Sequence, residues 1–330
     1  MTPRSVILSG TGGIWNVRTP TGEVVNAVLR GRLKKNDAPM RTDGSRKRDT
    51  DAAKGHVKLA VGDEVGLERN ERDDTWGIAE IFPRRSFLSR REPGGRYGER
   101  VIASNMDQVV IVFAAKKPEP HPRMLDRFLV IAEANELPVR IVINKVELVG
   151  EKAARGKFGE YERVGYPLHF TSVKEQIGLQ QLRDAMQDKT SVLTGPSGVG
   201  KSSLINSLFP GLDLRVGEIS ESVNKGRHTT VGASLHPLSA AEGAPGGYVA
   251  DTPGLREVGM WALPSEHLDD CFLEMRGLGE QCRFGDCTHR AEPDCAVRQA
   301  LSDGRISGDR YSSYVQLLEE LETTEKEKYK

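Results

Sequence analysis

The stretch "SVLTGPSGVGKSSLINSL", residues 191–208, places a Gly-rich turn between an apolar β-type run and a helix-forming run. It contains the pattern G-x-x-x-x-G-K-S, whose glycines let backbone N–H groups surround an anion at the N-terminus of the following helix. The pattern predicts a phosphate-binding loop made of Gly195, Pro196, Ser197, Gly198, Val199, Gly200, Lys201, Ser202 and Ser203. We expect Lys201 to reach the β- and γ-phosphates and the Ser202 hydroxyl to ligate Mg²⁺.

A second strand end supplies another element of a nucleotide site. The run "GGYVADTPG", residues 246–254, is an apolar strand that ends in Asp251 and continues to Gly254. Asp251 stands where it can hold the Mg²⁺ shell, and the Gly254 N–H can meet a γ-phosphate. This stretch favours a nucleoside triphosphatase over a protein whose Gly-rich turn binds no nucleotide.

Two more strand ends predict the part that reads the base. "VRIVINKVEL", residues 139–148, ends with Asn144, Lys145 and Glu147. A carboxylate at Glu147 can accept from guanine N1–H and N2–H₂ together, whereas adenine would leave buried polar groups unpaired. "HFTSV", residues 169–173, ends another strand, where Ser172 and Val173 are expected to support the base from its O6 side.

These elements follow one another in an unusual order, because the base-reading stretch precedes the phosphate loop. In a doubly wound sheet the binding crevice lies at the carboxyl ends of the strands, whichever strand the chain enters first. The order therefore predicts a circularly permuted GTPase domain of the P-loop type.

The rest of the chain divides into regions of different composition. Residues 1–93 show short β-type runs with turn residues, which predict an OB-type β-barrel, and residues 31–55 are charged enough to form a mobile loop. Residues 94–262 alternate apolar strands and amphipathic helices, which predicts a mainly parallel α/β sheet. Residues 263–330 carry a Cys/His cluster and then a helix with apolar residues on one face, namely Tyr311, Tyr314, Val315, Leu318 and Leu321.

The Cys/His cluster "CRFGDCTHRAEPDC" supplies four ligands within a short segment, Cys282, Cys287, His289 and Cys295. Thiolates and imidazole are the ligands of closed, tetrahedral structural Zn²⁺ sites. We expect one structural Zn²⁺ there, in a region too small to bury a large core. Cys271 lies outside the pattern and is expected to be a small apolar core residue.

The composition bears on the cellular compartment and on possible partners. Lys and Arg together number 47, as do Asp and Glu, so net charge selects no partner. No apolar run reaches the roughly 20 residues of a membrane span, and no signal peptide is recognisable. With four cysteines, three of them beside a histidine, the chain is expected to be cytoplasmic.

Taken together, "NKVEL", "TSV", "GPSGVGKSSLIN", "GRHTT", "DTPG" and the Cys/His pattern resemble the ribosome-small-subunit-dependent GTPase A family (RsgA/YjeQ). The resemblance implies an OB domain, a circularly permuted GTPase domain and a zinc-bearing helical domain. It also implies that the chain binds GTP and GDP with Mg²⁺, acts in late maturation of the small (30S) ribosomal subunit, and contacts its 16S-type rRNA. GTP hydrolysis would be stimulated by the ribosome. A monomer without a membrane partner is expected.

The resemblance also assigns roles to "GRHTT", residues 226–230. Thr229 or Thr230 is expected to ligate Mg²⁺, and the sequence does not choose between them. Leu255 follows DTPG, and an aliphatic side chain cannot orient water. The resemblance nominates His228 for this catalytic role.

Two other functions remain open from the sequence. A P-loop nucleotide kinase would share the phosphate loop but would leave DTPG and NKVE without a role. A non-catalytic RNA-binding protein that senses nucleotide is the other alternative. For RNA contact, the barrel offers Trp15 or Trp76 as stacking rings and a set of basic residues, namely Arg30, Arg32, Lys34, Lys35 and residues 46–48. The alternative is that the tryptophans belong to the barrel core and the basic residues to a solvated rim.

Overall fold

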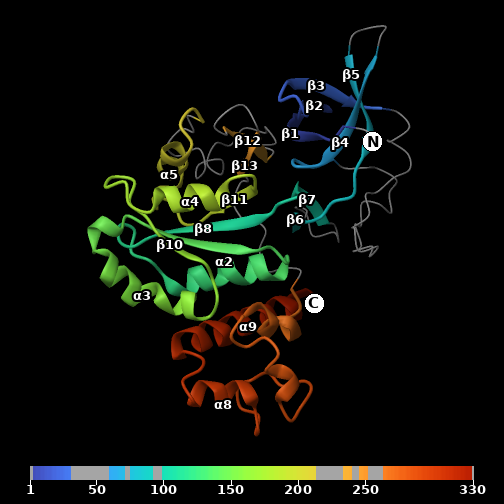
Figure 1. Cartoon of the computed structure of the whole chain (residues 1–330). Coiled ribbons are helices and arrows are strands. Elements are labelled where there is room, and N and C mark those ends of the chain that lie inside the picture. Colours follow the sequence, from blue (N-terminus) through green and yellow to red (C-terminus); the bar gives the residue numbers. More distant parts are fainter. Residues whose placement is uncertain are drawn as a thin grey trace.

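The computed structural model describes residues 3–30, 59–70, 75–91, 99–212, 233–239, 245–251 and 263–328. The predicted mobile loop at residues 31–55 lies outside these ranges, as do Arg32, Lys34, Lys35 and residues 46–48. Figure 1 shows three parts in chain order: a small β-barrel, a central sheet with helices, and a C-terminal helical region.

The N-terminal part is a closed five-stranded barrel with the strand order β1-β2-β3-β5-β4, as predicted. β3 and β5 pair in parallel, and the other neighbours are antiparallel. Alternate side chains point inward and form a small core around Ile7, Val17 and Ile78. The strands are β1 (Ser5–Thr11), β2 (Ile14–Arg18), β3 (Val24–Leu29), β4 (Glu64–Asn70) and β5 (Thr75–Ile81).

The two tryptophans considered for RNA stacking pack against this barrel core instead. Trp15 and Trp76 are partly buried against the inward-facing side chains. The Trp15 ring covers Gly10, where an added Cβ would stand 2.2 Å from the ring carbon Cε3. Arg30 is paired with Glu68 across the barrel surface. The two tryptophan rings thus cover the edge of an aliphatic core.

The central sheet has six strands in the order β10-β9-β8-β11-β13-β12. Its first five strands are parallel, and β12 is an antiparallel edge strand, which confirms the predicted mainly parallel α/β sheet. The strands are β8 (Gln108–Ala114), β9 (Val139–Asn144), β10 (Leu168–Phe170), β11 (Thr190–Thr194), β12 (Ser234–Ser239) and β13 (Pro245–Asp251).

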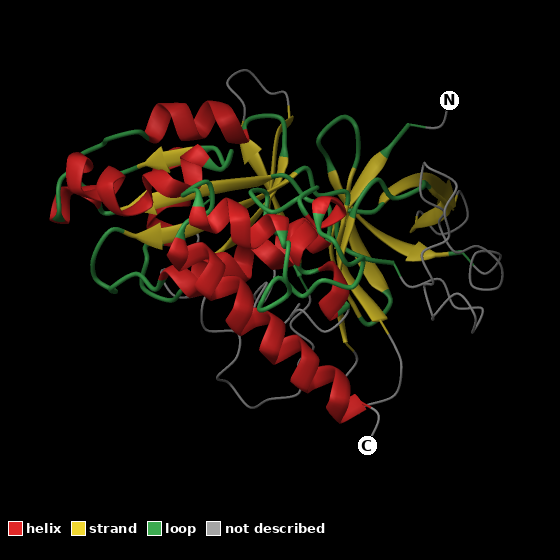
Figure 2. Ribbon diagram, turned by 90° about the horizontal axis from the view of Figure 1, so that it is seen from below, coloured by secondary structure: helices red, strands yellow, loops and turns green. Residues whose placement is uncertain are grey.

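Helices cover both faces of the sheet (Figures 1 and 2). Successive β8 residues face opposite sides, so Ile111 enters the core beneath α2 and α3, and Val112 enters the core beneath α4 and α5. All seven β8 residues are buried, as expected for a central parallel strand. The helices are α2 (Pro122–Ala134), α3 (Glu151–Arg163), α4 (Leu179–Met186) and α5 (Lys201–Leu208).

The strand order reverses between β8 and β11. From β8 the chain moves outward through β9 to β10, and from β11 it moves the other way to β13. A parallel sheet opens a crevice at the carboxyl ends of its strands at such a reversal. The topology therefore singles out the segments that follow β8 and β11 as the place for a ligand.

A short hairpin lies between the barrel and the central sheet in the chain, and a buried ion pair contacts this hairpin. The hairpin strands are β6 (Phe87–Arg91) and β7 (Glu99–Ser104), which pair antiparallel. Beside it, Arg84 donates to both carboxylate oxygens of the fully buried Asp63, at 2.7 and 2.9 Å. The Ser104 hydroxyl donates to the same carboxylate at 2.6 Å.

The C-terminal region consists of short helices around the Cys/His cluster and one long helix, α9, which ends beside the C label in Figure 2. Tyr314, Leu318 and Leu321 are buried as predicted, together with Leu317. The elements are the 3₁₀ helices η3 (Ser265–His267), η4 (Asp269–Cys271) and η5 (Gly279–Gln281), and the α-helices α8 (Ala296–Ser302) and α9 (Gly308–Lys328).

A buried charge cluster fastens α9 to the sheet module. The Arg310 guanidinium donates to Asp126 of α2 at 2.5 Å and to both oxygens of Glu274 at 2.6 and 3.0 Å. The Tyr161 hydroxyl of α3 donates to Asp126 at 2.9 Å. Three charged side chains are thus withdrawn from water at one helix contact, and each has hydrogen-bonding partners.

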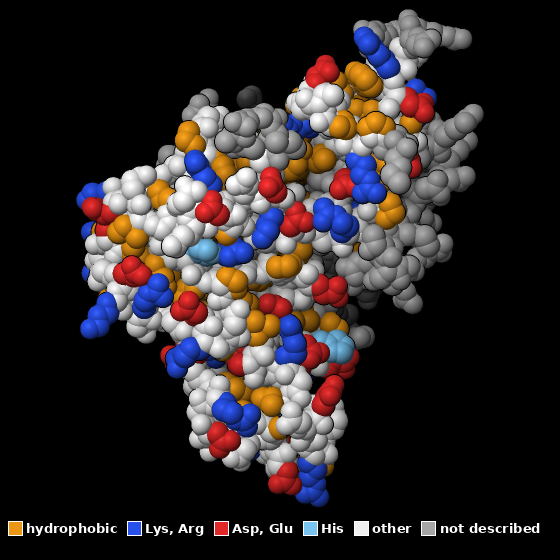
Figure 3. Space-filling model, viewed as in Figure 1, with side chains coloured by type: hydrophobic (Ala, Val, Ile, Leu, Met, Phe, Trp, Pro, Cys, Tyr) orange, Lys and Arg blue, Asp and Glu red, His pale blue; other side chains and the backbone are white. Residues whose placement is uncertain are grey.

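The outer surface carries mixed charge. On the face seen in Figure 3, Lys and Arg side chains alternate with Asp and Glu, in keeping with a chain that has 47 of each class. Within the described ranges, no helix has the length and apolar character needed to cross a bilayer.

Candidate nucleotide site and metal centre

The phosphate loop lies between β11 and α5, at the reversal of the sheet. Gly195 has a φ of 137°, and an added Cβ would stand 2.0 Å from the Val112 carbonyl oxygen of β8. Only glycine allows the loop to press so closely on the neighbouring strand. The Lys201 ammonium group donates to the carbonyl oxygens of Gly195 and Pro196, at 3.0 and 2.9 Å. The Lys201 side chain, which starts α5, therefore folds back over the phosphate loop.

The base-reading stretch contacts this loop directly. The Asn144 amide, at the end of β9, donates to the Val199 carbonyl at 2.9 Å, and the Lys145 ammonium donates to the Gly198 carbonyl at 2.6 Å. An added Cβ at Gly200 would stand 2.7 Å from the same Asn144 amide. Two stretches separated by about one-sixth of the chain thus form one site, as the permuted order predicts.

The Glu147 carboxylate follows at the first turn after β9, in the 3₁₀ helix η2 (Val146–Leu148). Its Oε2 atom is buried and has no hydrogen-bonding partner in the structure. A buried acceptor without a donor carries a desolvation cost of about 1–3 kcal/mol. The N1–H and N2–H₂ groups of guanine are donors that the Glu147 carboxylate can pair with once its side chain turns Oε2 out from under the protein atoms that cover it.

The loop after β10 completes this edge of the sheet. Ser172 is fully buried, and its hydroxyl oxygen accepts from the backbone N–H of Glu175 at 3.0 Å. The hydroxyl accepts in this turn and keeps its own hydrogen as a donor, so it and the backbone near Val173 are both candidates for a contact with guanine O6. Thr171 donates to the Asn144 side-chain oxygen at 3.2 Å and so links this loop to the base-reading strand.

Several predicted residues lie outside the described ranges, namely His228, Thr229, Thr230, Gly254 and Leu255. Asp251 is the last residue of β13, and its backbone pairs with Ser234 of β12. Ser202 is buried in the first turn of α5. Of the residues predicted to ligate Mg²⁺, the structure therefore describes the side chain of Ser202 and the backbone of Asp251.

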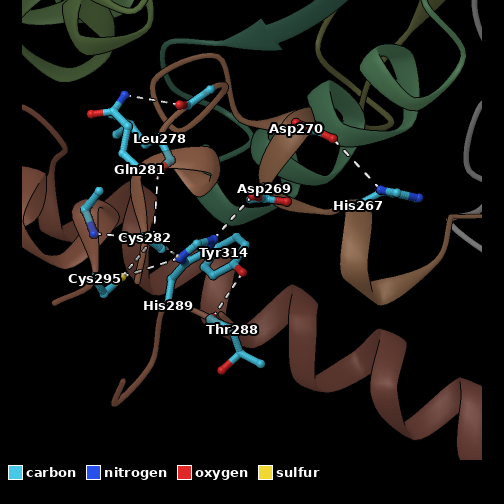
Figure 4. Close-up of polar contacts among 12 residues, drawn as sticks. His267, Asp269, Asp270, Leu278, Gln281, Cys282, Thr288, His289, Cys295 and Tyr314 are labelled. Atoms are coloured by element: carbon cyan, nitrogen blue, oxygen red, sulfur yellow. Dashed lines mark hydrogen bonds and ion pairs between the residues drawn. The ribbon is translucent and has the colours of Figure 1, made fainter. Parts of the chain in front are cut away.

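The cysteines and histidine predicted to bind zinc converge. One ligand atom from each of Cys282, Cys287, His289 and Cys295 lies within 4.8 Å of every other. The His289 Nδ1 atom lies 3.6 Å from Cys282 Sγ and 3.4 Å from Cys295 Sγ, and these two sulfurs are 3.9 Å apart (Figure 4). Tetrahedral Zn²⁺ with Zn–S bonds of about 2.3 Å would place sulfurs about 3.8 Å apart. The cluster could therefore hold zinc.

Cys271 is separate from this cluster, as predicted. Its side chain is buried in the core beside Phe272, and its thiol contacts the His267 carbonyl at 3.6 Å. Burial raises the pKa of the Cys271 thiol to about 12, so the thiol stays protonated at neutral pH. This state suits a small apolar core residue.

Sequence reasoning missed three residues that the structure brings to these sites. Lys117, in the segment after β8, supplies a carbonyl that accepts from Lys145 at 2.6 Å. Thr171 meets Asn144, and Asp269 meets His289 Nε2 at 3.2 Å. The position of Lys117 directly after an apolar strand was an available signal, whereas Asp269 belongs to no recognisable motif.

Comparison with known proteins places these sites in a family context. The RsgA GTPase family model matches residues 81–261. A protein of Gemmatimonas aurantiaca named "Small ribosomal subunit biogenesis GTPase RsgA" is 53% identical over 317 residues, or 96% of each chain. A protein of Alkaliphilus metalliredigens with the same name is 38% identical and covers 79% of this chain and 85% of its own length.

Solved structures agree with these matches. YjeQ from Thermotoga maritima is 32% identical with a TM-score of 0.74, covering 97% of this chain and 99% of its own. YloQ, described as a circularly permuted GTPase, is 29% identical with a TM-score of 0.70, covering 98% of this chain and 96% of its own. These matches confirm the predicted architecture of barrel, permuted GTPase domain and C-terminal helical region.

Proposed function

The chain belongs to the RsgA GTPase family and hydrolyses GTP, and we propose that it does so in the biogenesis of the small ribosomal subunit. The names of its relatives support this role. Membership of a GTPase family decides against the nucleotide kinase and against the non-catalytic RNA-binding protein. A guanine nucleotide with Mg²⁺ is accordingly the cofactor of the site.

One observation carries the assignment of the site residues. Hydrogen bonds from Asn144 and Lys145 reach the carbonyls of Val199 and Gly198, so the end of the base-reading strand and the phosphate loop lie against each other. One nucleotide can therefore touch Glu147 with its base and Lys201 with its phosphates. Chain order has no bearing on this contact, since the strand ends lie side by side.

The proposed mechanism assigns a task to each residue of the crevice. Lys201 would exchange its two loop carbonyls for phosphate oxygens, and Glu147 would orient the base through its N–H groups. Ser202 and Asp251, with Thr229 or Thr230, would hold Mg²⁺, which supplies charge neutralisation at the phosphates when it is bound. Ser172 and Val173 would close the base side, and Gly254 would meet the γ-phosphate.

Hydrolysis also requires a group that orients the attacking water. Leu255 has an aliphatic side chain and cannot do so. We assign this task to His228, because its imidazole both donates and accepts hydrogen bonds. The family resemblance of "GRHTT" supports the assignment.

The proposed partner of the chain is the maturing small ribosomal subunit. We propose that the chain binds the small (30S) subunit and its 16S-type rRNA late in maturation, that the ribosome stimulates hydrolysis, and that hydrolysis switches release. We place the domain boundaries at residues 1–93, 94–262 and 263–330, and expect a cytoplasmic monomer. The Cys/His cluster would carry one structural Zn²⁺.

The test measures GTP turnover with and without purified small ribosomal subunits, with ATP as the nucleotide control. We expect the subunits to raise GTP turnover and leave ATP untouched. His228→Ala should retain GTP affinity and lose the stimulated turnover, whereas His267→Ala, at an exposed histidine of the C-terminal region, should behave as the unaltered protein. Turnover that the subunits do not change would refute the ribosomal role.

A further inference from the structure

The His289 ring lies between the cysteine cluster and a carboxylate. Its Nδ1 atom faces the sulfurs of Cys282 and Cys295, and its Nε2 atom lies 3.2 Å from Asp269 Oδ2 (Figure 4). A metal-binding nitrogen must be free of its proton, so the other ring nitrogen carries the hydrogen. With Nδ1 toward the cluster, the Nε2–H donates to Asp269.

The Asp269 carboxylate lies between His289 and Gly279. Asp269 belongs to η4, and an added Cβ at Gly279 would stand 2.9 Å from its Oδ2 atom, so a side chain there would push on the carboxylate that contacts the ring. The Asp269 side chain is 19% exposed, whereas that of the next residue, Asp270, is 63% exposed. The carboxylate that reaches the ring is therefore the buried one of two neighbours.

The histidine is constrained from its other side as well. His289 has a φ of 62°, a left-handed conformation that is unfavourable for a residue with a side chain. Tyr311 of α9 donates its hydroxyl to the His289 carbonyl at 2.7 Å, and the Tyr314 ring lies 6.0 Å from the imidazole. α9 therefore holds the backbone of His289, and the Asp269 carboxylate holds its ring.

We propose that Asp269 is a positioning residue of the zinc centre. Its carboxylate fixes the tautomer and the orientation of His289 so that Nδ1 points at the metal, and its negative charge makes the imidazole a stronger ligand. The inference rests on the zinc site proposed above. It goes beyond that site, because Asp269 is not a ligand and lies upstream of all four ligands in the chain.

The test measures zinc affinity on the full-length chain, by competition with a chromogenic chelator. Asp269→Ala should lower the affinity about 10–100-fold, in the range found when such supporting carboxylates are removed. Asp269→Asn should show a smaller loss, because the amide oxygen still accepts from Nε2–H but the charge is gone. Asp270→Ala, next along the chain and exposed, should stay within about threefold of the unaltered protein.

A second measurement separates ring orientation from folding. Co²⁺ in place of Zn²⁺ gives visible absorption bands that depend on ligand geometry. Asp269→Ala, which removes the acceptor for Nε2–H, should alter the bands while circular dichroism is unchanged, and Asp269→Asn, which keeps an acceptor, should alter them less. An Ala variant with unchanged bands, or with zinc affinity within threefold of the unaltered protein, would overturn the proposal. If the unaltered protein fails to hold one zinc per chain, the zinc site itself is refuted, and that result precedes any variant.

Discussion

Replacing Arg310 by methionine should loosen α9 from the GTPase module more than any surface change. The guanidinium, whose side chain is 2% exposed, makes three short contacts, with Asp126 at 2.5 Å and with Glu274 at 2.6 and 3.0 Å. Burial alone would lower the pKa of Arg310, but the hydrogen bonds with Glu274 and the charge of Asp126 outweigh burial and raise it. Arg310→Met leaves two carboxylates buried without their cation.

Breaking a buried pair in this way costs about 3–5 kcal/mol, because the remaining charge stays unpaired in a poorly polarisable interior. Since about 1.4 kcal/mol is a tenfold change in an equilibrium constant, the opening of α9 should become about 150- to 4,000-fold more frequent. Hydrogen exchange followed by mass spectrometry on peptides from residues 308–328 measures this opening directly.

The same two helices provide a matched control. Arg127 of α2 pairs with Glu320 of α9 at 2.6 Å, but these side chains are 40% and 47% exposed. An exposed pair contributes about 0–1 kcal/mol, so Arg127→Met should change exchange by less than about sixfold. Equal effects of the two arginine replacements would refute the reasoning.

A charge-neutral background tests the cause. Adding Asp126→Asn and Glu274→Gln to Arg310→Met removes the unpaired charges, so the exchange of α9 should slow again relative to the single variant. If the triple variant exchanges as fast as Arg310→Met, unpaired charge is not the source of the loss.

Three further outcomes are expected. Glu147→Gln should weaken GTP binding at least about tenfold and improve binding of xanthosine triphosphate, because the amide donates where the carboxylate accepted; unchanged affinities in a fluorescent-nucleotide titration would contradict the role of Glu147. Gly195→Ala should abolish tight Mg–GTP binding, because its Cβ would stand 2.0 Å from a β8 carbonyl oxygen. The control is Gly156→Ala, in α3 with open space around it. This variant should bind Mg–GTP normally and gain about 0.5–1 kcal/mol of helix stability. Burial, with the nearby Arg140, lowers the pKa of His169 from 6.5 to about 4. Between about pH 6.5 and 4 the unfolded chain binds the proton and the folded chain does not, so stability falls as the pH falls through this window, and His169→Asn should flatten that part of a denaturation-against-pH curve.

The structure brings the predicted phosphate loop and the predicted base-reading stretch into contact. Each stretch could be proposed from the sequence because it depends on a few consecutive residues. A Gly-rich turn between a strand and a helix, and polar residues at the end of an apolar strand, are recognisable without knowledge of the rest of the chain. The Cys/His spacing is equally local, and the structure brings Cys282, Cys287, His289 and Cys295 together as predicted.

The sequence left open which way the barrel tryptophans face, and it did not indicate the residues that support the metal cluster. Whether Trp15 and Trp76 face solvent or the interior depends on how five strands close, and the structure packs both against the core. Asp269 could not be chosen over Asp270 from the sequence. The two residues are of the same type and adjacent, and only the fold decides which carboxylate faces His289.

The chain by itself therefore determined which chemical groups stand at the strand ends, and the permuted order in which they occur. Only the tertiary structure decided that the Asn144 amide reaches Val199, that a Glu147 oxygen is buried without a partner, and that Arg310 joins α9 to α2. The reason is physical: a motif is set by bonds along the backbone, whereas burial and pairing of charge arise from contacts between segments far apart in sequence, which exist only once the sheet and its helices have packed.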